Sequence, residues 1–90
     1  MSEGYDVRLS ASAARALEVD LPESVAAAAW EFIDGPLRQN PRRVGKQLRE
    51  PLFPLYSARR GQYRVLYRIE EDLVLIDVVR ITHRRDAHRR

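Results

Sequence analysis

The most constraining feature of this sequence is a pair of hydrophobic segments, residues 63–69 and 73–81, separated by three acidic residues. In the first segment apolar side chains recur with period two, as in a strand with one buried face. This would place Tyr63, Val65, Tyr67 and Ile69 on one face, and Arg64, Leu66 and Arg68 on the other. The second segment is apolar almost throughout, which predicts a central strand covered on both faces. The acidic triplet at 70–72 then predicts a hairpin turn.

The N-terminal third predicts a strand followed by two helices. Residues 5–9 alternate apolar and polar side chains, and Ser10 then offers a hydroxyl N-cap for a helix over about residues 11–18. Asp20 and Glu23 resemble the capping box of a second helix, which Gly35-Pro36 should end or kink. The apolar stripe of this helix is expected to face the core: Ala26, Ala29, Trp30, Ile33 and Leu37.

The remaining elements complete the predicted fold class. Residues 38–54 are basic and rich in proline, and predict irregular structure. A weaker strand is expected over residues 55–59, and a short polar helix or turn over residues 83–90. The order β-α-α-β-β-β indicates a small α+β fold, a single domain over residues 1–90. Its two N-terminal helices are expected to pack on one face of an antiparallel-rich four-stranded sheet.

The charge of this chain is strongly segregated along the sequence. Residues 35–69 hold nine basic side chains and one acidic side chain, whereas residues 1–34 hold two and seven. The net charge of +3 therefore conceals a cationic middle third. Fifteen of the sixteen basic residues are arginine, which binds phosphate through two parallel hydrogen bonds. This segregation favours a nucleic acid or another polyanion as a partner.

Composition also excludes several classes of protein. The chain has no cysteine, which excludes a disulfide framework and a thiolate metal site. The apolar run at residues 25–30 is far shorter than the roughly 20 residues of a membrane span. The first ten residues have neither the basic nor the apolar region of a signal peptide. We therefore expect a cytoplasmic protein without a membrane partner.

Motifs in the second half of the chain occur in a recognisable order. Residues 61–67 read Gly-x-Tyr-Arg, two hydrophobic residues and Tyr, and residues 83–86 read His-Arg-Arg-Asp. Upstream, Asn40-Pro41 is followed by Gly45-Lys46-x-Leu48. In this order and spacing the motifs resemble the RelE/ParE toxin superfamily, over about residues 5–89. The mycobacterial RelE-like branch is the nearest.

The resemblance implies the toxin of a type II toxin–antitoxin pair, inhibited by a cognate RelB-like antitoxin. RelE-like members are metal-independent endoribonucleases that cut mRNA on the ribosome. A ribose 2′-OH attacks the adjacent phosphate, which leaves a cyclic phosphate and a 5′-OH. The resemblance therefore implies an mRNA interferase without a cofactor, whose partners are the antitoxin, the ribosome and mRNA. DNA would be contacted only indirectly, through the antitoxin complex.

Two other functions remain open on the same scaffold. ParE-like members share the fold but lack the nuclease residues and inhibit DNA gyrase. The short helices and the basic tail of this chain favour the nuclease over the gyrase inhibitor. The third alternative is an RNA- or ribosome-binding module without toxicity.

The resemblance assigns the catalytic roles to Arg64, Arg84 and His88. Arg64 lies in the motif that carries the family's phosphate-binding arginine, and Arg84 matches its second catalytic arginine. His88 stands where related sequences often have tyrosine, and a histidine can act as a general acid or base near neutral pH. The alternative for Arg64 is a solvated position or an ion pair with Asp77. The alternative for Arg84 is a tail charge without a role.

Other cations are expected to contact RNA or the ribosome: Lys46, Arg49, Arg59, Arg60, Arg68 and Arg85. The best-known ribonuclease members carry lysines on the strand before the Gly-x-Tyr-Arg motif, and residues 55–57 contain none. Some of these cations would have to replace those lysines. His83 is expected to orient the site or to contact RNA. No metal site is expected from His83, Asp86 and His88, because offsets of three and five residues do not share a helical face.

Overall fold

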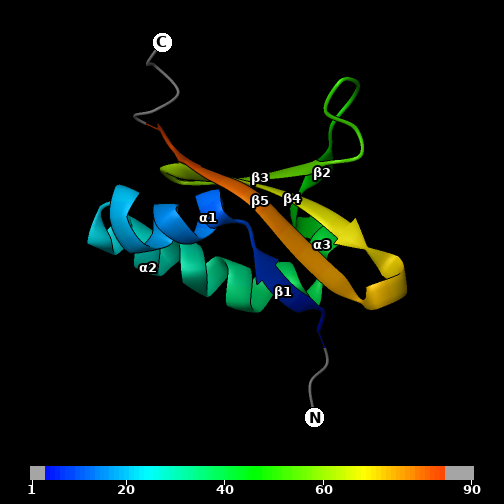
Figure 1. The fold of residues 1–90 in the computed structure, drawn as a ribbon, viewed down its shortest axis with the longest axis horizontal. Helices are drawn as coiled ribbons and strands as arrows, with labels where there is room; N and C mark the ends of the chain where they lie inside the picture. Colours follow the sequence, from blue (N-terminus) through cyan, green and yellow to red (C-terminus); the bar gives the residue numbers. More distant parts are fainter. Residues whose placement is uncertain (1–3, 85–90) are drawn as a thin grey trace.

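The computed structural model describes residues 4–84, which form a five-stranded mixed sheet with helices on one face (Figure 1). The strands are β1 (Asp6–Leu9), β2 (Lys46–Gln47), β3 (Tyr56–Arg60), β4 (Tyr63–Glu70) and β5 (Leu75–His83). They lie in the order β1-β5-β4-β3-β2. β1 is parallel to β5, and all other neighbours are antiparallel. The expected α+β class and helix layer are confirmed, but the expected count of four strands is one too few.

The additional strand is β2, inside the segment that was expected to be irregular. Lys46 pairs with Ser57 and Gln47 with Tyr56, so β2 extends the sheet beyond β3. The loop that follows is closed by the Leu48 amide, which donates to the Leu55 carbonyl at 2.8 Å. A two-residue strand carries no periodic signal, and only its neighbour defines it.

The long hairpin of β4 and β5 forms the centre of the sheet. The alternation predicted for β4 is confirmed, because Tyr63, Val65 and Tyr67 are buried while Arg64 is exposed. β5 begins at Leu75, after an exposed turn, and its buried residues alternate with partly exposed ones. The expectation that this strand is covered on both faces is therefore wrong. The helices cover only one face of the sheet and leave the other open (Figure 1).

A β-bulge interrupts the pairing of β4 with β5. Tyr67 pairs with Val78, whereas the residue before it, Leu66, pairs with Arg80, so Val79 is an extra residue in β5. The Val79 carbonyl accepts a hydrogen bond from the Ser10 hydroxyl at 2.6 Å. Bulges bend a strand and increase its twist, and the residues of β5 beyond this one, residues 80–83, remain paired with β4.

The first helix begins as predicted. Ser10 caps α1 (Ala11–Arg15) by accepting from the Ala13 amide at 3.0 Å, and the helix continues as a π-helical turn, Ala16–Asp20. The predicted capping box is wrong, because α2 (Glu23–Phe32) has Pro22 at its N-cap and no side-chain cap.

The second helix continues past Gly35-Pro36, which was expected to end or kink it. It does so through a π-helical turn, Ile33–Leu37, whose wider hydrogen-bond spacing tolerates the missing amide of the proline. Trp30 was expected in the core but is 42% exposed. The buried stripe instead passes through Val25, Ala29 and Ile33, and Trp30 lies beside it. Within residues 4–84, no helix is both long and apolar enough to cross a bilayer.

Tyr67 lies at the centre of the core. Its ring is fully buried and stacks on Tyr56 with centroids 5.6 Å apart. Its hydroxyl donates to the Pro41 carbonyl at 2.5 Å and thereby attaches the short helix α3 (Pro41–Val44) to the sheet. Burial raises the pKa of Tyr67 to about 12, so the phenol stays protonated and keeps this hydrogen bond.

Candidate active site

A cavity of about 360 Å³ lies where the β3–β4 hairpin meets the end of β5. We call it the arginine cavity, because three of its lining residues are arginines. It is lined by Arg59, Gly61, Gln62, Tyr63, Arg64, Thr82, His83 and Arg84. Three neighbouring strands therefore contribute to one cationic hollow.

The strand register explains why these arginines meet. Arg64 on β4 lies directly opposite Arg59 on β3 and opposite Thr82 on β5. Residues paired across strands share a face, with Cβ atoms about 4.5–5.5 Å apart. The Arg84 amide donates to the Gln62 carbonyl at 2.5 Å, which fixes the chain after β5 against the hairpin turn. The sequence predicted both Arg64 and Arg84, and the structure brings them into one cavity.

Among the residues that the structure describes, the arginines of the arginine cavity have no acidic partner: no carboxylate forms an ion pair with Arg59, Arg64 or Arg84. All three residues are exposed, so their guanidinium groups are accessible to a ligand as far as residues 4–84 are concerned. Like charges at this spacing repel one another, and a bound anion relieves that repulsion. The arrangement therefore suits a phosphate group of a polyanion.

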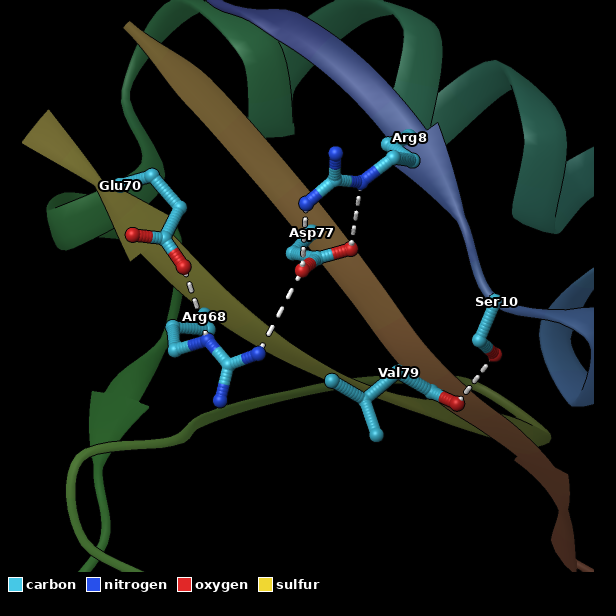
Figure 2. A network of polar contacts seen from close by, with 6 residues as sticks. All are labelled: Arg8, Ser10, Arg68, Glu70, Asp77 and Val79. Atoms are coloured by element: carbon cyan, nitrogen blue, oxygen red, sulfur yellow. Dashed lines mark hydrogen bonds and ion pairs between the residues drawn. The ribbon is translucent and has the colours of Figure 1, made fainter. Parts of the chain in front are cut away.

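Arg68, which was expected to contact RNA, lies in a different electrostatic environment on the same face. Its guanidinium binds Glu70 at 3.0 Å and Asp77 at 3.4 Å (Figure 2). Asp77 also pairs with Arg8 on β1 at 3.2 Å. We call these four residues the paired cluster. The alternative partner considered for Arg64, Asp77, is thus shared by Arg8 and Arg68 instead.

Asp77 is the centre of the paired cluster. Its side chain is only 15% exposed, and it accepts hydrogen bonds from both arginines. The hydrogen bond from Arg8, aided by the charges of both guanidinium groups, holds the pKa of Asp77 below its ordinary value. The carboxylate therefore remains ionised and neutralises its neighbours.

Among the expected RNA contacts within residues 4–84, only Arg59 lines the cavity. Lys46 on β2 and Arg49 in the following loop are exposed at the edge of the sheet beyond β3. Arg60 lies on the helix-covered face, with its guanidinium 4.7 Å from the centre of the Phe32 ring. It also donates to the Val44 carbonyl, so part of its function is structural.

Some expected site residues are not among those that the structure describes. Arg85 and His88 lie outside residues 4–84, as does Asp86 of the rejected metal site. His83 is buried at the end of β5 and lines the cavity. Within residues 4–84, no group of metal-ligating side chains comes together.

Sequence reasoning missed two polar residues of the cavity, Gln62 and Thr82. Gln62 occupies the unspecified position of the Gly-x-Tyr-Arg motif, directly after the turn glycine. Thr82 is separated from Arg64 by 18 positions and meets it only through the β4–β5 register. The turn position was a signal for Gln62, whereas nothing local identified Thr82.

Comparison with known proteins identifies the family of this chain. The family model described as the ParE toxin of type II toxin–antitoxin systems matches residues 7–88. The chain belongs to the RelE/ParE toxin superfamily. The match spans α1, α2 and α3, all of the sheet except the first residue of β1, and every arginine of the arginine cavity.

Within the superfamily, the similar relatives are RelE-type toxins. Toxin RelE of Mycobacterium tuberculosis is 47% identical over 85 residues, which are 94% of this chain and 87% of that protein. Toxin RelG of the same organism is 45% identical, over 96% of this chain and 98% of its own length. The toxin–antitoxin complex RelBE2 of M. tuberculosis contains a chain with 44% identity and a TM-score of 0.86, covering 90% of this chain and 99% of that chain. The chain is thus a RelE-family toxin of the type II class.

Proposed function

We propose that this RelE-family toxin is an endoribonuclease that cleaves mRNA on the ribosome. The observation that carries the proposal is the arginine cavity, where Arg59, Arg64 and Arg84 face one hollow without a carboxylate partner among residues 4–84. A polyanion binds such a site at a single phosphate. The named likeness to RelE toxins supports RNA as that polyanion.

The proposed reaction is an in-line transesterification. The ribose 2′-oxygen attacks the adjacent phosphorus and loses its proton to a general base. The bond from phosphorus to the 5′-oxygen breaks, and that oxygen takes up a proton, which leaves a cyclic phosphate and a 5′-OH. Charge develops on the non-bridging oxygens during this step, and arginines already in place stabilise it without reorganisation.

Each residue has a distinct part in this reaction. Arg64 and Arg84 donate to the non-bridging oxygens, and Arg59 holds the phosphate from the neighbouring strand. His88 serves as the acid or base, by its position in the terminal motif. No step requires a metal ion or a cofactor.

The proposed partners follow from the same charge distribution. The ribosome and mRNA contact the exposed cations at the sheet edge, Lys46 and Arg49. A cognate RelB-like antitoxin inhibits the toxin by covering the arginine cavity with an acidic segment. A relative of this chain is part of the toxin–antitoxin complex RelBE2 of M. tuberculosis, which supports an antitoxin as a partner.

Two observations favour a second function. The matching family model carries the name of ParE toxins, and no lysine stands at residues 55–57 before the hairpin turn. Both facts fit a gyrase inhibitor without nuclease activity. Double-strand DNA breaks with intact mRNA after induction would identify that function.

The deciding experiment is induction of three proteins without antitoxin: wild type, Arg64→Ala and Arg15→Ala. Arg15 is an exposed arginine of α1 and provides a matched loss of charge in the helix layer. Wild type and Arg15→Ala are expected to arrest growth and cleave mRNA, and purified wild type to cut mRNA on programmed ribosomes. Equal arrest by all three proteins without cleaved transcripts would contradict the proposal.

A further inference from the structure

A second cavity, of about 290 Å³, lies on the other side of the β3–β4 turn. Three of its lining residues come from α2, namely Ser24, Val25 and Ala28, and four from the hairpin, namely Arg60, Gly61, Gln62 and Tyr63. We call it the helix-side cavity. Tyr63, Gln62 and the turn glycine line both cavities, so the two spaces are separated only by the turn.

The helix-side cavity has an apolar floor and a polar rim. Val25 and the Tyr63 ring are buried, and the Tyr63 hydroxyl is directed to the Ala28 carbonyl at 3.3 Å. The Ser24 hydroxyl and the Gln62 amide lie at the exposed rim, and neither has a hydrogen-bond partner within residues 4–84. An apolar cleft with a few polar groups is typical of a ligand site.

The turn between the cavities is thin and open. Gly61 has a φ of +52°, which favours glycine, and within residues 4–84 no atom beyond its two chain neighbours lies within 4 Å of the position where its Cβ would stand. Gly61 itself therefore presents no side chain to a single strand of RNA that crosses the turn. The two cavities share Gly61, Gln62 and Tyr63, so they adjoin at this turn.

We propose that the helix-side cavity binds one unstacked nucleobase of the RNA whose phosphate lies in the arginine cavity, and that Gln62 and Ser24 hydrogen-bond to the edge of that base. The proposal deepens the proposed ribonuclease function and rests on it. Proteins that read RNA sequence take up splayed bases in this way. A glutamine amide offers one donor and one acceptor and can distinguish bases by their edges. Base preference would then arise beside the site of chemistry.

A nucleobase fits this site better than an apolar side chain of a protein partner does. An aliphatic group would cover the Ser24 hydroxyl and the Gln62 amide without satisfying them, which is costly. A base presents a flat apolar face to Val25 and Tyr63, and polar edge atoms to the rim. Arg60 stands at the same cavity and adds positive charge next to the backbone of the RNA.

The test fills the cavity and compares two adjacent positions on one helix. Ala28→Leu places a larger side chain in the helix-side cavity, whereas Ala27→Leu makes the same change at an exposed position that does not line it. Cleavage is measured on ribosomes programmed with mRNAs that vary every base around the cut. Ala28→Leu is expected to raise KM about tenfold and to flatten the base preference, with kcat retained, because one stacked base is lost. Ala27→Leu is expected to match wild type.

A binding experiment separates this proposal from the ribonuclease function. The probe is a fluorescent single-stranded RNA with 2′-O-methyl ribose throughout, which cannot be cleaved, together with versions that each carry one abasic position. Wild type is expected to lose about tenfold in affinity at one abasic position, and Ala28→Leu to lose nothing further there. If this result holds while wild type cleaves no mRNA, the base site stands and the ribonuclease function fails.

Three results would overturn the base site. One is an identical cleavage profile and KM for Ala28→Leu and Ala27→Leu, with both proteins folded by circular dichroism. Another is the absence of any position-dependent abasic effect in wild type. The third is weaker binding of the antitoxin by Ala28→Leu without any change in RNA discrimination, which would assign the cavity to a protein side chain.

Discussion

The two ends of the open sheet face carry arginines in opposite situations. In the paired cluster, Arg8 and Arg68 share the carboxylate of Asp77, and Arg68 also binds Glu70. In the arginine cavity, three arginines face one hollow without a carboxylate partner among residues 4–84. Both ends lie on strands β4 and β5. Pairing therefore determines where this surface is available to a polyanion, and the number of cations along the sequence does not.

The difference has an energetic consequence for binding. A phosphate at the paired cluster must compete with carboxylates that already hold the guanidinium groups. A phosphate at the arginine cavity meets no competing carboxylate from residues 4–84 and relieves repulsion between like charges. The open face of the sheet therefore favours anion binding at the arginine cavity, beside the β3–β4 turn, over the paired cluster.

The strongest test of this contrast compares Arg64→Ala with Arg68→Ala. Loss of Arg64 is expected to lower kcat for mRNA cleavage by roughly 10²–10³-fold, as for a lost donor to developing negative charge. Arg68→Ala should reduce cleavage far less, because its side chain is occupied by Glu70 and Asp77. Single-turnover cleavage on programmed ribosomes measures both. Equal losses in the two variants would remove the distinction between the ends.

The salt dependence of RNA binding sharpens the same contrast. Each phosphate contact to single-stranded RNA adds about 0.7 to the slope of log affinity against log salt concentration. Arg59→Ala should reduce that slope by about this amount, because Arg59 lines the arginine cavity. Arg68→Ala should leave the slope as it is in wild type. Fluorescence anisotropy across a series of salt concentrations gives both slopes, and a reduced slope for Arg68→Ala would show that the paired cluster also binds phosphate.

Removing the shared carboxylate of Asp77 should make the arginines of the paired cluster more available to a phosphate, like those of the arginine cavity. Asp77→Asn removes the shared carboxylate charge and leaves Arg8 facing Arg68. We expect the free energy of unfolding to fall by roughly 1 kcal/mol and the affinity for RNA to rise. Urea denaturation and RNA titration measure the two effects. Asp72→Asn, an exposed change of the same charge in the β4–β5 turn, is the control and should lack the stability loss.

The smallest expected effect is the pH dependence of this stabilisation. Since the pKa of Asp77 is lowered in the folded state, its contribution to stability is complete above its ordinary value, near 3.8. The contribution is lost as the pH falls through the lowered folded-state pKa. The stability difference between wild type and Asp77→Asn should therefore be constant near neutral pH and shrink below about pH 4. A difference that instead grows toward low pH would exclude Asp77 as its source.

Much of the fold was predictable because its signals are local. The alternation over residues 63–69 identified β4, and the hydroxyl of Ser10 identified the start of α1. β2 was not predictable, because two residues carry no period and pair only with a folded neighbour. Trp30 was misplaced because it borders the apolar stripe of α2, and only the packing determines which edge of that stripe is buried.

The candidate site likewise has a part that local motifs predicted and a part that depends on strand register. Arg64 and Arg84 were named from motifs, and their meeting in one cavity agrees with that prediction. Arg68 meets Asp77 because the β4–β5 register places these two residues opposite each other. The bulge at Val79 shifts this register for the later residues of β5. No local sequence pattern predicted the bulge. The roles of His88 and Arg85 stay predictions from the terminal motif.

The exposed position of Trp30 has a consequence for spectroscopy. It is the only tryptophan of the chain, and this residue is already 42% exposed in the folded state. Unfolding should therefore change the emission of Trp30 little, so a small fluorescence change on denaturation would not indicate an unstable core. A molecule that covers α2, in contrast, should shift the emission to shorter wavelength. The intrinsic fluorescence of this toxin thus reports on what its helices touch.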